Sequence, residues 1–285
     1  MRRPERIIDL QRETRNILID KLIKSYELET RDIADCVELY YDAQKLRIMH
    51  GNKERSEGVG ELISWFSYWL EIGEKVIMGK LKHWVESDKS SPEARWAYEQ
   101  TGVGPVIASG LAAHIDVTKA PTVSALWKFA GQAPGDDRKV RGKKLPYNER
   151  LKVLCWKLGE SLVKVSGKEG ATYGHLYAQF KAEEIARNEQ GKYAEAARRE
   201  LATKHFSDDT VTLKRLKAGK LSDAHLHARA KRRAVKIFLS HYWEKGREGQ
   251  RLPVRPSYPI GILKHDGEIK PQPATSVCLT RCWDE

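Results

Sequence analysis

Residues 101–108 read TGVGPVIA, in which two glycines flank one apolar residue and are followed directly by proline. Glycine permits positive φ angles and lets a backbone approach a ligand without an intervening Cβ. Proline suits the first turn of a helix, where its missing N–H would be unpaired in any case. The stretch therefore predicts a tight turn that leads from one helix directly into the next, with Val103 turned inward.

Small and apolar residues on both sides of this turn have helical spacing. They are Ala94, Ala97 and Tyr98 before the turn, and Ala108, Leu111 and Ala112 after it. This pattern predicts a helix-hairpin-helix, because small residues allow two helices to cross closely. The turn N–H groups and the dipole of the second helix can then hold a phosphate oxygen. We assign nucleic-acid contact at the hairpin to Gly102, Val103, Gly104, Val106 and Ile107. The alternative is that the turn only connects two helices.

The rest of the chain reads as all-α. Residues 1–88 predict long helices in a coiled or bundled arrangement, with a loop at His50-Gly51-Asn52. Residues 92–165 predict a compact helix-hairpin-helix domain of short helices, and residues 171–245 predict charged helices that complete it. Ser222 is placed to cap the last of these helices. Repeated prolines in residues 246–285 predict an extended tail.

An aromatic stripe marks the long N-terminal helices. It consists of Trp65, Phe66, Tyr68 and Trp69. Burying such a stripe between two copies of the chain would drive association, so a homodimer through these helices is one expectation. The alternative is that the stripe packs within one chain.

The chain is strongly basic, with a formal net charge of +12 and a pI of about 9.4. Such an excess favours a polyanionic partner. Cations gather in a glycine-containing loop after the hairpin, where several of them could contact one phosphate backbone. These residues are Arg138, Lys139, Arg141, Lys143 and Lys144. The alternative is an ordinary solvated loop.

A second basic segment lies on the helix that follows Ser222. Its cationic stripe consists of Arg229, Arg232, Arg233 and Lys236, and is either a solvated face or a second backbone contact. Three nearby aromatic residues, Trp127, Tyr147 and Trp156, have the chemistry to stack on bases. Trp127 and Trp156 fall in apolar helical patterns, so we expect both to pack in the core.

Several classes of protein are excluded by what the sequence lacks. The apolar stretches are too short and too interrupted to span a bilayer, and the N-terminus lacks a secretory signal, so we expect a cytoplasmic protein without membrane contact. Cys278 and Cys282 have no second Cys or His pair at finger-like spacing. We therefore predict no bound metal and no cofactor.

From the hairpin onward the chain resembles the C-terminal transposase domain of the RNA-guided insertion-sequence transposases. The resemblance covers roughly residues 92–165, with a weaker echo in the helix after Ser222. It rests on GVGPVIASGL (102–111), on LWKFAGQAP (126–134) and on the basic stretch through Lys152. The family implies DNA as the partner, a guide RNA, an N-terminal RuvC-like nuclease domain and a coiled helical segment, which residues 1–88 resemble.

Two catalytic parts of that family are missing. The helical N-terminus offers no strand-rich domain with four spaced acids, and the stretch GDDRK (135–139) contains no serine where the family has its nucleophile. We therefore expect no catalytic residues, and a DNA-binding protein for duplex or branched DNA that lacks enzymatic activity. One alternative is a recombinase or nuclease with a divergent metal site at Asp136 and Asp137. Another is an RNA-binding or assembly module.

Overall fold

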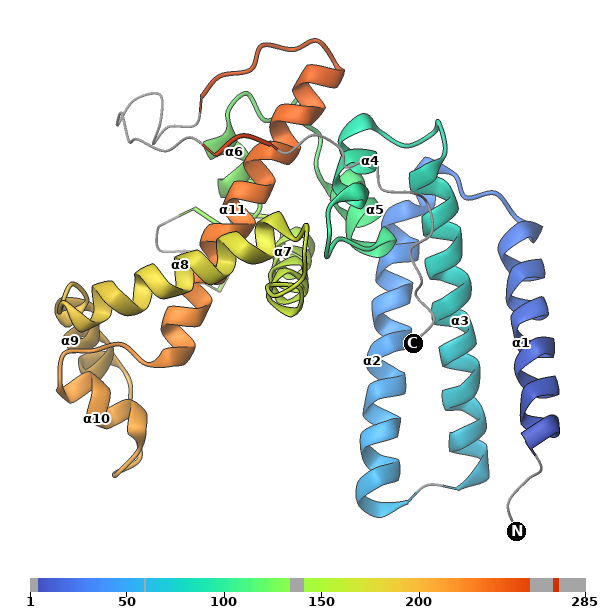
Figure 1. Cartoon of the computed structure of the whole chain (residues 1–285), viewed down its shortest axis with the longest axis horizontal. Helices are drawn as coiled ribbons and strands as arrows, with labels where there is room; N and C mark the ends of the chain where they lie inside the picture. Colours follow the sequence, from blue (N-terminus) through green and yellow to red (C-terminus); the bar gives the residue numbers. More distant parts are fainter. Residues whose placement is uncertain (1–4, 59, 134–140, 257–268, 272–285) are drawn as a thin grey trace. The chain divides into compact units, whose positions relative to one another are not determined.

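The computed structural model describes residues 5–58, 60–133, 141–256 and 269–271, with side chains from residue 13 onwards. Within these ranges every regular element is a helix and none is a strand, which confirms the predicted all-α fold (Figure 1). The chain divides into two compact units. Unit 1 comprises Met1–Tyr98 and Gly104–Asp116, and unit 2 comprises Glu99–Val103 and Val117–Glu285.

Unit 1 is built on a pair of long antiparallel helices. Its elements are α1 (Glu5–Ser25), η1 (Thr30–Asp32), α2 (Ile33–Glu57), α3 (Glu61–Glu86), α4 (Pro92–Glu99, up to Tyr98) and α5 (Pro105–His114). Helices α2 and α3 lie side by side, and α1 runs along α3 in the same direction (Figure 1). Helix α5 packs against both α2 and α3, where the Ser109 hydroxyl donates to the Leu81 carbonyl at 3.4 Å. The buried residues of α5 therefore pack against the side of the helix pair.

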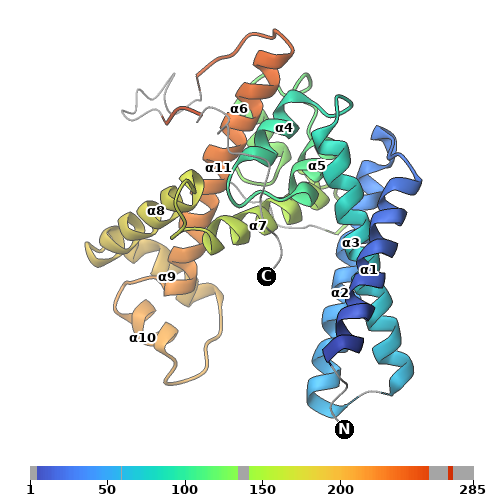
Figure 2. The same ribbon diagram turned by 45° about the vertical axis from the view of Figure 1, so that its right-hand side comes forward.

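Unit 2 is organised around its longest helix, α11. Its elements are α6 (Val123–Phe129), α7 (Glu149–Lys164), α8 (Thr172–Glu189), α9 (Ala194–Thr203), α10 (Val211–Lys217) and α11 (Asp223–Gly249). Helix α11 packs against α6, α7 and α8, and buries Phe238, Tyr242 and Trp243 almost completely (Figure 2). The Ser222 side chain accepts a hydrogen bond from the His225 N–H, so the predicted cap of this helix is confirmed.

Three sequence-based boundaries differ from the structure. The loop predicted at His50-Gly51-Asn52 is wrong, because α2 continues to Glu57 and the chain turns at Gly58, where φ is +73°. A glycine inside a helix costs about 1 kcal/mol, and packing of α2 against α3 outweighs that cost. The division into units also departs from the boundary predicted near residue 92, since α4 and α5 belong to unit 1. Helix α11 runs to Gly249, and the described residues beyond it, 250–256 and 269–271, form no helix or strand.

Candidate nucleic-acid interface

The net positive charge of the chain comes from one of the two units. Unit 2 carries 34 Lys and Arg against 20 Asp and Glu, whereas unit 1 carries 17 against 19. The formal net charges are therefore +14 for unit 2 and −2 for unit 1. A polyanion is therefore expected to be attracted more strongly to unit 2 than to unit 1.

The turn of the hairpin gives its two glycines different roles. Gly102 has φ of +93°, and its carbonyl accepts a hydrogen bond from the Ser161 hydroxyl of α7 at 2.6 Å. A Cβ at this position would lie 2.8 Å from Cγ2 of Val165. Gly104, in contrast, has an ordinary φ of −83° and open space around the position of its Cβ. Of the two positions, only 102 therefore has a backbone conformation and surroundings that require glycine.

The predicted contact residues of the hairpin are mostly inaccessible through their side chains. Val103, Val106 and Ile107 are buried, and the Ile107 N–H is already bonded to the Gly104 carbonyl at 3.1 Å. The N–H groups of Gly104 and Val106 donate no hydrogen bond to a described residue and stand at the start of α5. Any phosphate contact of these residues would therefore use backbone N–H groups such as those of Gly104 and Val106.

The basic loop after the hairpin is described only in part. Arg138 and Lys139 lie outside the described residues, as do Asp136 and Asp137. Arg141, Lys143 and Lys144 are exposed, and none of them forms an ion pair with a described residue. Cations without a carboxylate partner keep their full charge for a polyanion.

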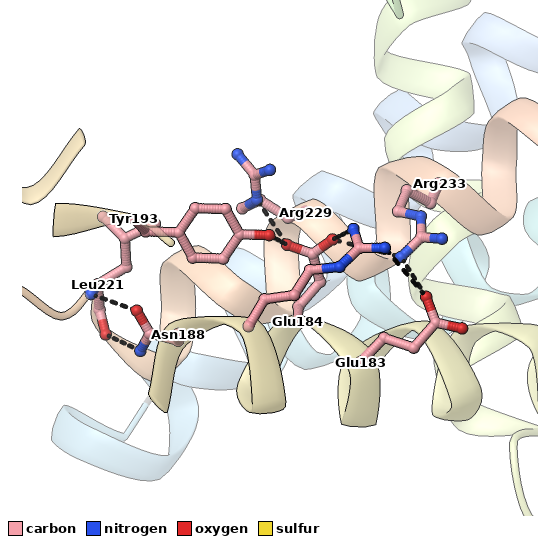
Figure 3. Close-up of polar contacts among 8 residues, drawn as sticks. Glu183, Glu184, Asn188, Tyr193, Leu221, Arg229 and Arg233 are labelled. Atoms are coloured by element: carbon pink, nitrogen blue, oxygen red, sulfur yellow. Dashed lines mark hydrogen bonds and ion pairs between the residues drawn. The ribbon is translucent and has the colours of Figure 1, made fainter. Parts of the chain in front are cut away.

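Ion pairs divide the cationic stripe of α11, because Arg229 and Arg233 are paired with a glutamate of α8. Arg229 Nε lies 2.7 Å from Oε2 of Glu184, and Arg233 Nη1 lies 3.3 Å from its other oxygen, Oε1 (Figure 3). The Tyr193 hydroxyl donates to Glu184 at 2.6 Å, and Arg187 approaches it as well. The Glu184 side chain is 1 % exposed, so these arginines neutralise a buried carboxylate that joins α8 to α11.

The charges around Glu184 also set its titration. Burial raises the pKa of Glu184, but the hydrogen bonds from Tyr193 and Arg229 and the nearby guanidinium charges outweigh it and leave the pKa below its ordinary value. Glu184 is thus ionised at neutral pH. Arg229 and Arg233 therefore have a structural role as partners of a buried carboxylate, and their contact with nucleic acid stays a prediction.

The remaining two cations of the stripe are arranged differently. Arg232 is exposed, and Lys236 lies with its Nζ 4.0 Å from the ring centroid of Trp127, whose indole N–H donates to the Lys236 carbonyl. Neither Arg232 nor Lys236 is ion-paired within the described part of the chain. Burial and the charge of Arg232 together lower the pKa of Lys236. Arg232 and Lys236 are thus two neighbouring basic residues without a carboxylate partner among the described residues, and the lowered pKa makes Lys236 the easier of the two to deprotonate.

Two aromatic residues on or near α7 each have a lysine ammonium group over the ring, as Trp127 does. Lys152 Nζ lies 3.9 Å from the ring centroid of Tyr147, and Lys231 Nζ of α11 lies 5.1 Å from that of Trp156. Lysine over an aromatic face is a favourable cation–π contact.

The expectation that Trp156 packs in the core is wrong. Trp156 is 58 % exposed, whereas Trp127 is 8 % exposed and buried as predicted. At 100° per residue, position 156 falls on the side of α7 opposite its buried leucines, which are Leu151, Leu154, Leu158 and Leu162. The apolar residues around Trp156 are therefore close to it in sequence, but they lie on a different face of the helix.

Other chemistry finds no support in the part of the chain that the structure describes. No three Asp, Glu, His or Cys side chains gather there as a metal site would require, and the Cys278–Cys282 pair lies outside that part. In the same residues, none of the helices combines the length and the apolar character needed to cross a bilayer. No family model, curated protein or solved structure matches the chain.

Proposed function

We propose that this chain is a nucleic-acid-binding protein that grips the phosphate backbone through unit 2. The observation that carries the proposal is the charge of +14 on unit 2 against −2 on unit 1. A surface with an excess of cations releases condensed counterions when it meets phosphates, and this supplies sequence-independent affinity. The resemblance to transposases makes DNA the expected partner, and RNA is the alternative.

The contacts fall on cations that the fold leaves unpaired. Lys143, Lys144 and Arg232 are exposed and make no ion pair with described residues, in contrast to Arg229 and Arg233. The free N–H groups of Gly104 and Val106 are a separate candidate contact at the hairpin.

The test compares two triple variants that remove the same charge. One is Lys143→Ser/Lys144→Ser/Arg232→Ser in unit 2, and the other is Lys24→Ser/Lys45→Ser/Lys82→Ser, which removes exposed, unpaired cations from unit 1. Fluorescence anisotropy with labelled duplex DNA and RNA is measured across a series of salt concentrations. We expect weaker binding and a salt dependence reduced by about one counterion per lost contact for the unit 2 variant alone.

Two results would contradict the proposal. Equal weakening by both variants would mean that total charge, and not the surface of unit 2, determines affinity. A wild-type affinity that does not change with salt would exclude phosphate contacts as its source. Stronger binding to RNA than to DNA would keep the proposal and change the partner. Incubating the same duplex with Mg²⁺ tests the enzyme alternative, which predicts cleavage.

A further inference from the structure

Trp156 is the most exposed tryptophan among the described residues of unit 2. Its side chain is 58 % exposed, its neighbour on the same side of α7, Val153, is 54 % exposed, and its indole N–H makes no hydrogen bond with the described residues. Trp127 shows the usual arrangement for this residue type, with a buried ring and a paired N–H. A large flat ring held in water by a rigid helix is thus available to a ligand.

The groups around Trp156 are mainly cationic. Lys152 precedes it by four residues and lies on the same side of α7, and Lys231 approaches the ring from α11. Lys231 is paired with Glu160, one helical turn after Trp156, so that carboxylate is neutralised. Gly159 permits this close crossing, because a Cβ there would lie 2.6 Å from Cγ of Lys231. Arg232 and Lys236 follow Lys231 on α11 by one and five residues, and neither makes an ion pair with a described residue.

An exposed aromatic ring, with unpaired cations on its own helix and on the helix packed against it, matches the chemistry of a nucleotide strand. Each nucleotide offers a flat base and a negative phosphate, and stacking on an aromatic side chain tolerates any base. In a duplex the faces of the bases are covered by their neighbours, so only an unpaired base can lie against a tryptophan ring. A protein partner with an apolar surface would gain nothing from Lys152, Arg232 and Lys236.

We propose that Trp156 stacks against an unpaired base of a single-stranded nucleic acid, whose phosphates are held by Lys152, Arg232 and Lys236. This inference rests on the proposed function and names the form of nucleic acid that unit 2 prefers. It assigns different roles to the cations and to the tryptophan ring. The cations contact any strand, and Trp156 discriminates unpaired from paired bases.

The experiment measures anisotropy with a labelled oligothymidine of about 16 nucleotides, a length in the range of known single-strand sites, and with a duplex of equal length. The variants are Trp156→Ala, Trp156→Phe and, as a matched control, Trp65→Ala, which removes a tryptophan that is 53 % exposed in unit 1. We expect Trp156→Ala to raise the Kd for the single strand by about 5- to 100-fold and to leave duplex binding within about twofold. Trp156→Phe should recover most of the loss, and Trp65→Ala should change neither Kd.

A second readout is the tryptophan fluorescence of the protein. Stacking on a base should quench part of the emission of the eight tryptophans, and that quenching should be absent in Trp156→Phe. Unchanged melting temperature and circular dichroism of Trp156→Ala would show that the fold is intact, as expected for an exposed side chain.

The outcomes separate the inference from the function on which it rests. If Trp156→Ala binds the single strand like the wild type while Lys143→Ser/Lys144→Ser/Arg232→Ser binds more weakly, the stacking role is overturned and nucleic-acid binding stands. If the wild type binds none of the probes at low salt, both proposals are overturned. If Trp156→Ala changes only the sedimentation behaviour of the protein, Trp156 belongs to a protein interface and the inference is likewise overturned.

Discussion

The hairpin turn supports a quantitative comparison between its two glycines. Replacing Gly102 by alanine adds a Cβ at φ of +93°, in contact with Val165, whereas the same change at Gly104 meets open space at φ of −83°. The two substitutions are chemically identical and lie two residues apart. Any difference between them therefore reports the local backbone and packing.

The expected size of the difference follows from two costs. A left-handed conformation costs a residue with a Cβ about 1–2 kcal/mol. The contact of 2.8 Å with Cγ2 of Val165 forces a shift at a β-branched side chain, and overpacking of this kind costs about 1–3 kcal/mol. We therefore expect Gly102→Ala to lower the free energy of unfolding by about 2–5 kcal/mol. Gly104→Ala should change the free energy of unfolding by no more than about 0.5 kcal/mol. Alanine is a poorer N-cap than glycine, which destabilises the fold, but it also reduces the entropy of the unfolded chain, which stabilises the fold.

Thermal unfolding followed by circular dichroism measures the difference. For a domain of 150–250 residues, each kcal/mol lowers the Tm by roughly 2–4 °C. Gly102→Ala should accordingly melt well below the wild type, and Gly104→Ala should melt close to it. Equal shifts in the two variants, or a wild-type Tm for Gly102→Ala, would refute the assignment of strain to Gly102 alone.

Four further predictions follow from the polar contacts and the free groups. Glu184→Gln should lower the urea midpoint of unfolding at pH 7 but not at pH 3. The lowered pKa of Glu184 means that its carboxylate stabilises the fold above the ordinary carboxyl pKa, and this stability is lost as the pH falls through the pKa of the folded state. An equal loss at both pH values would contradict this role. Asn188 bonds both the N–H and the carbonyl of Leu221, at 2.9 and 3.1 Å, so Asn188→Leu should cost about 2–4 kcal/mol in urea unfolding, and a neutral result would count against this link. Gly104→Glu should weaken duplex binding while leaving the Tm unchanged, since open space accepts the side chain and its carboxylate repels phosphate; unaltered binding would remove the hairpin from the interface. Burial raises the pKa of the Cys155 thiol to about 12, so mass spectrometry should find it alkylated at pH 8 only after denaturation, and modification in the native protein would show that the site opens.

Local features of the fold were predictable from the sequence. The turn at Gly102, the start of α4 at Pro92 and the Ser222 cap of α11 all involve residues within four positions of one another. Interactions of this range depend on the φ preference of one residue or on one side-chain acceptor, which a sequence displays directly. The cationic stripe on α11 could also be predicted from the sequence, but the ion pairs that two of its arginines form could not.

The candidate site was only partly predictable, and Trp156 shows why. Its apolar neighbours in sequence suggested burial, but the direction of its side chain depends on which face of α7 meets α11 and α8. The loop expected at Gly51 failed for a related reason, since the packing of α2 on α3 overrides a local preference. In each instance the deciding contact comes from a distant segment.

The sequence by itself determined that this chain is helical, strongly basic and turned sharply at residues 101–108, because these properties depend on composition and on short-range geometry. Only the tertiary structure decided which cations are available. Arg229 and Arg233 are bound to a glutamate 45 and 49 residues away in the chain, whereas Arg232, between them in sequence, has no such partner among the described residues. Pairing across such distances is set by the packing of α8 on α11, and no pattern within α11 reveals it.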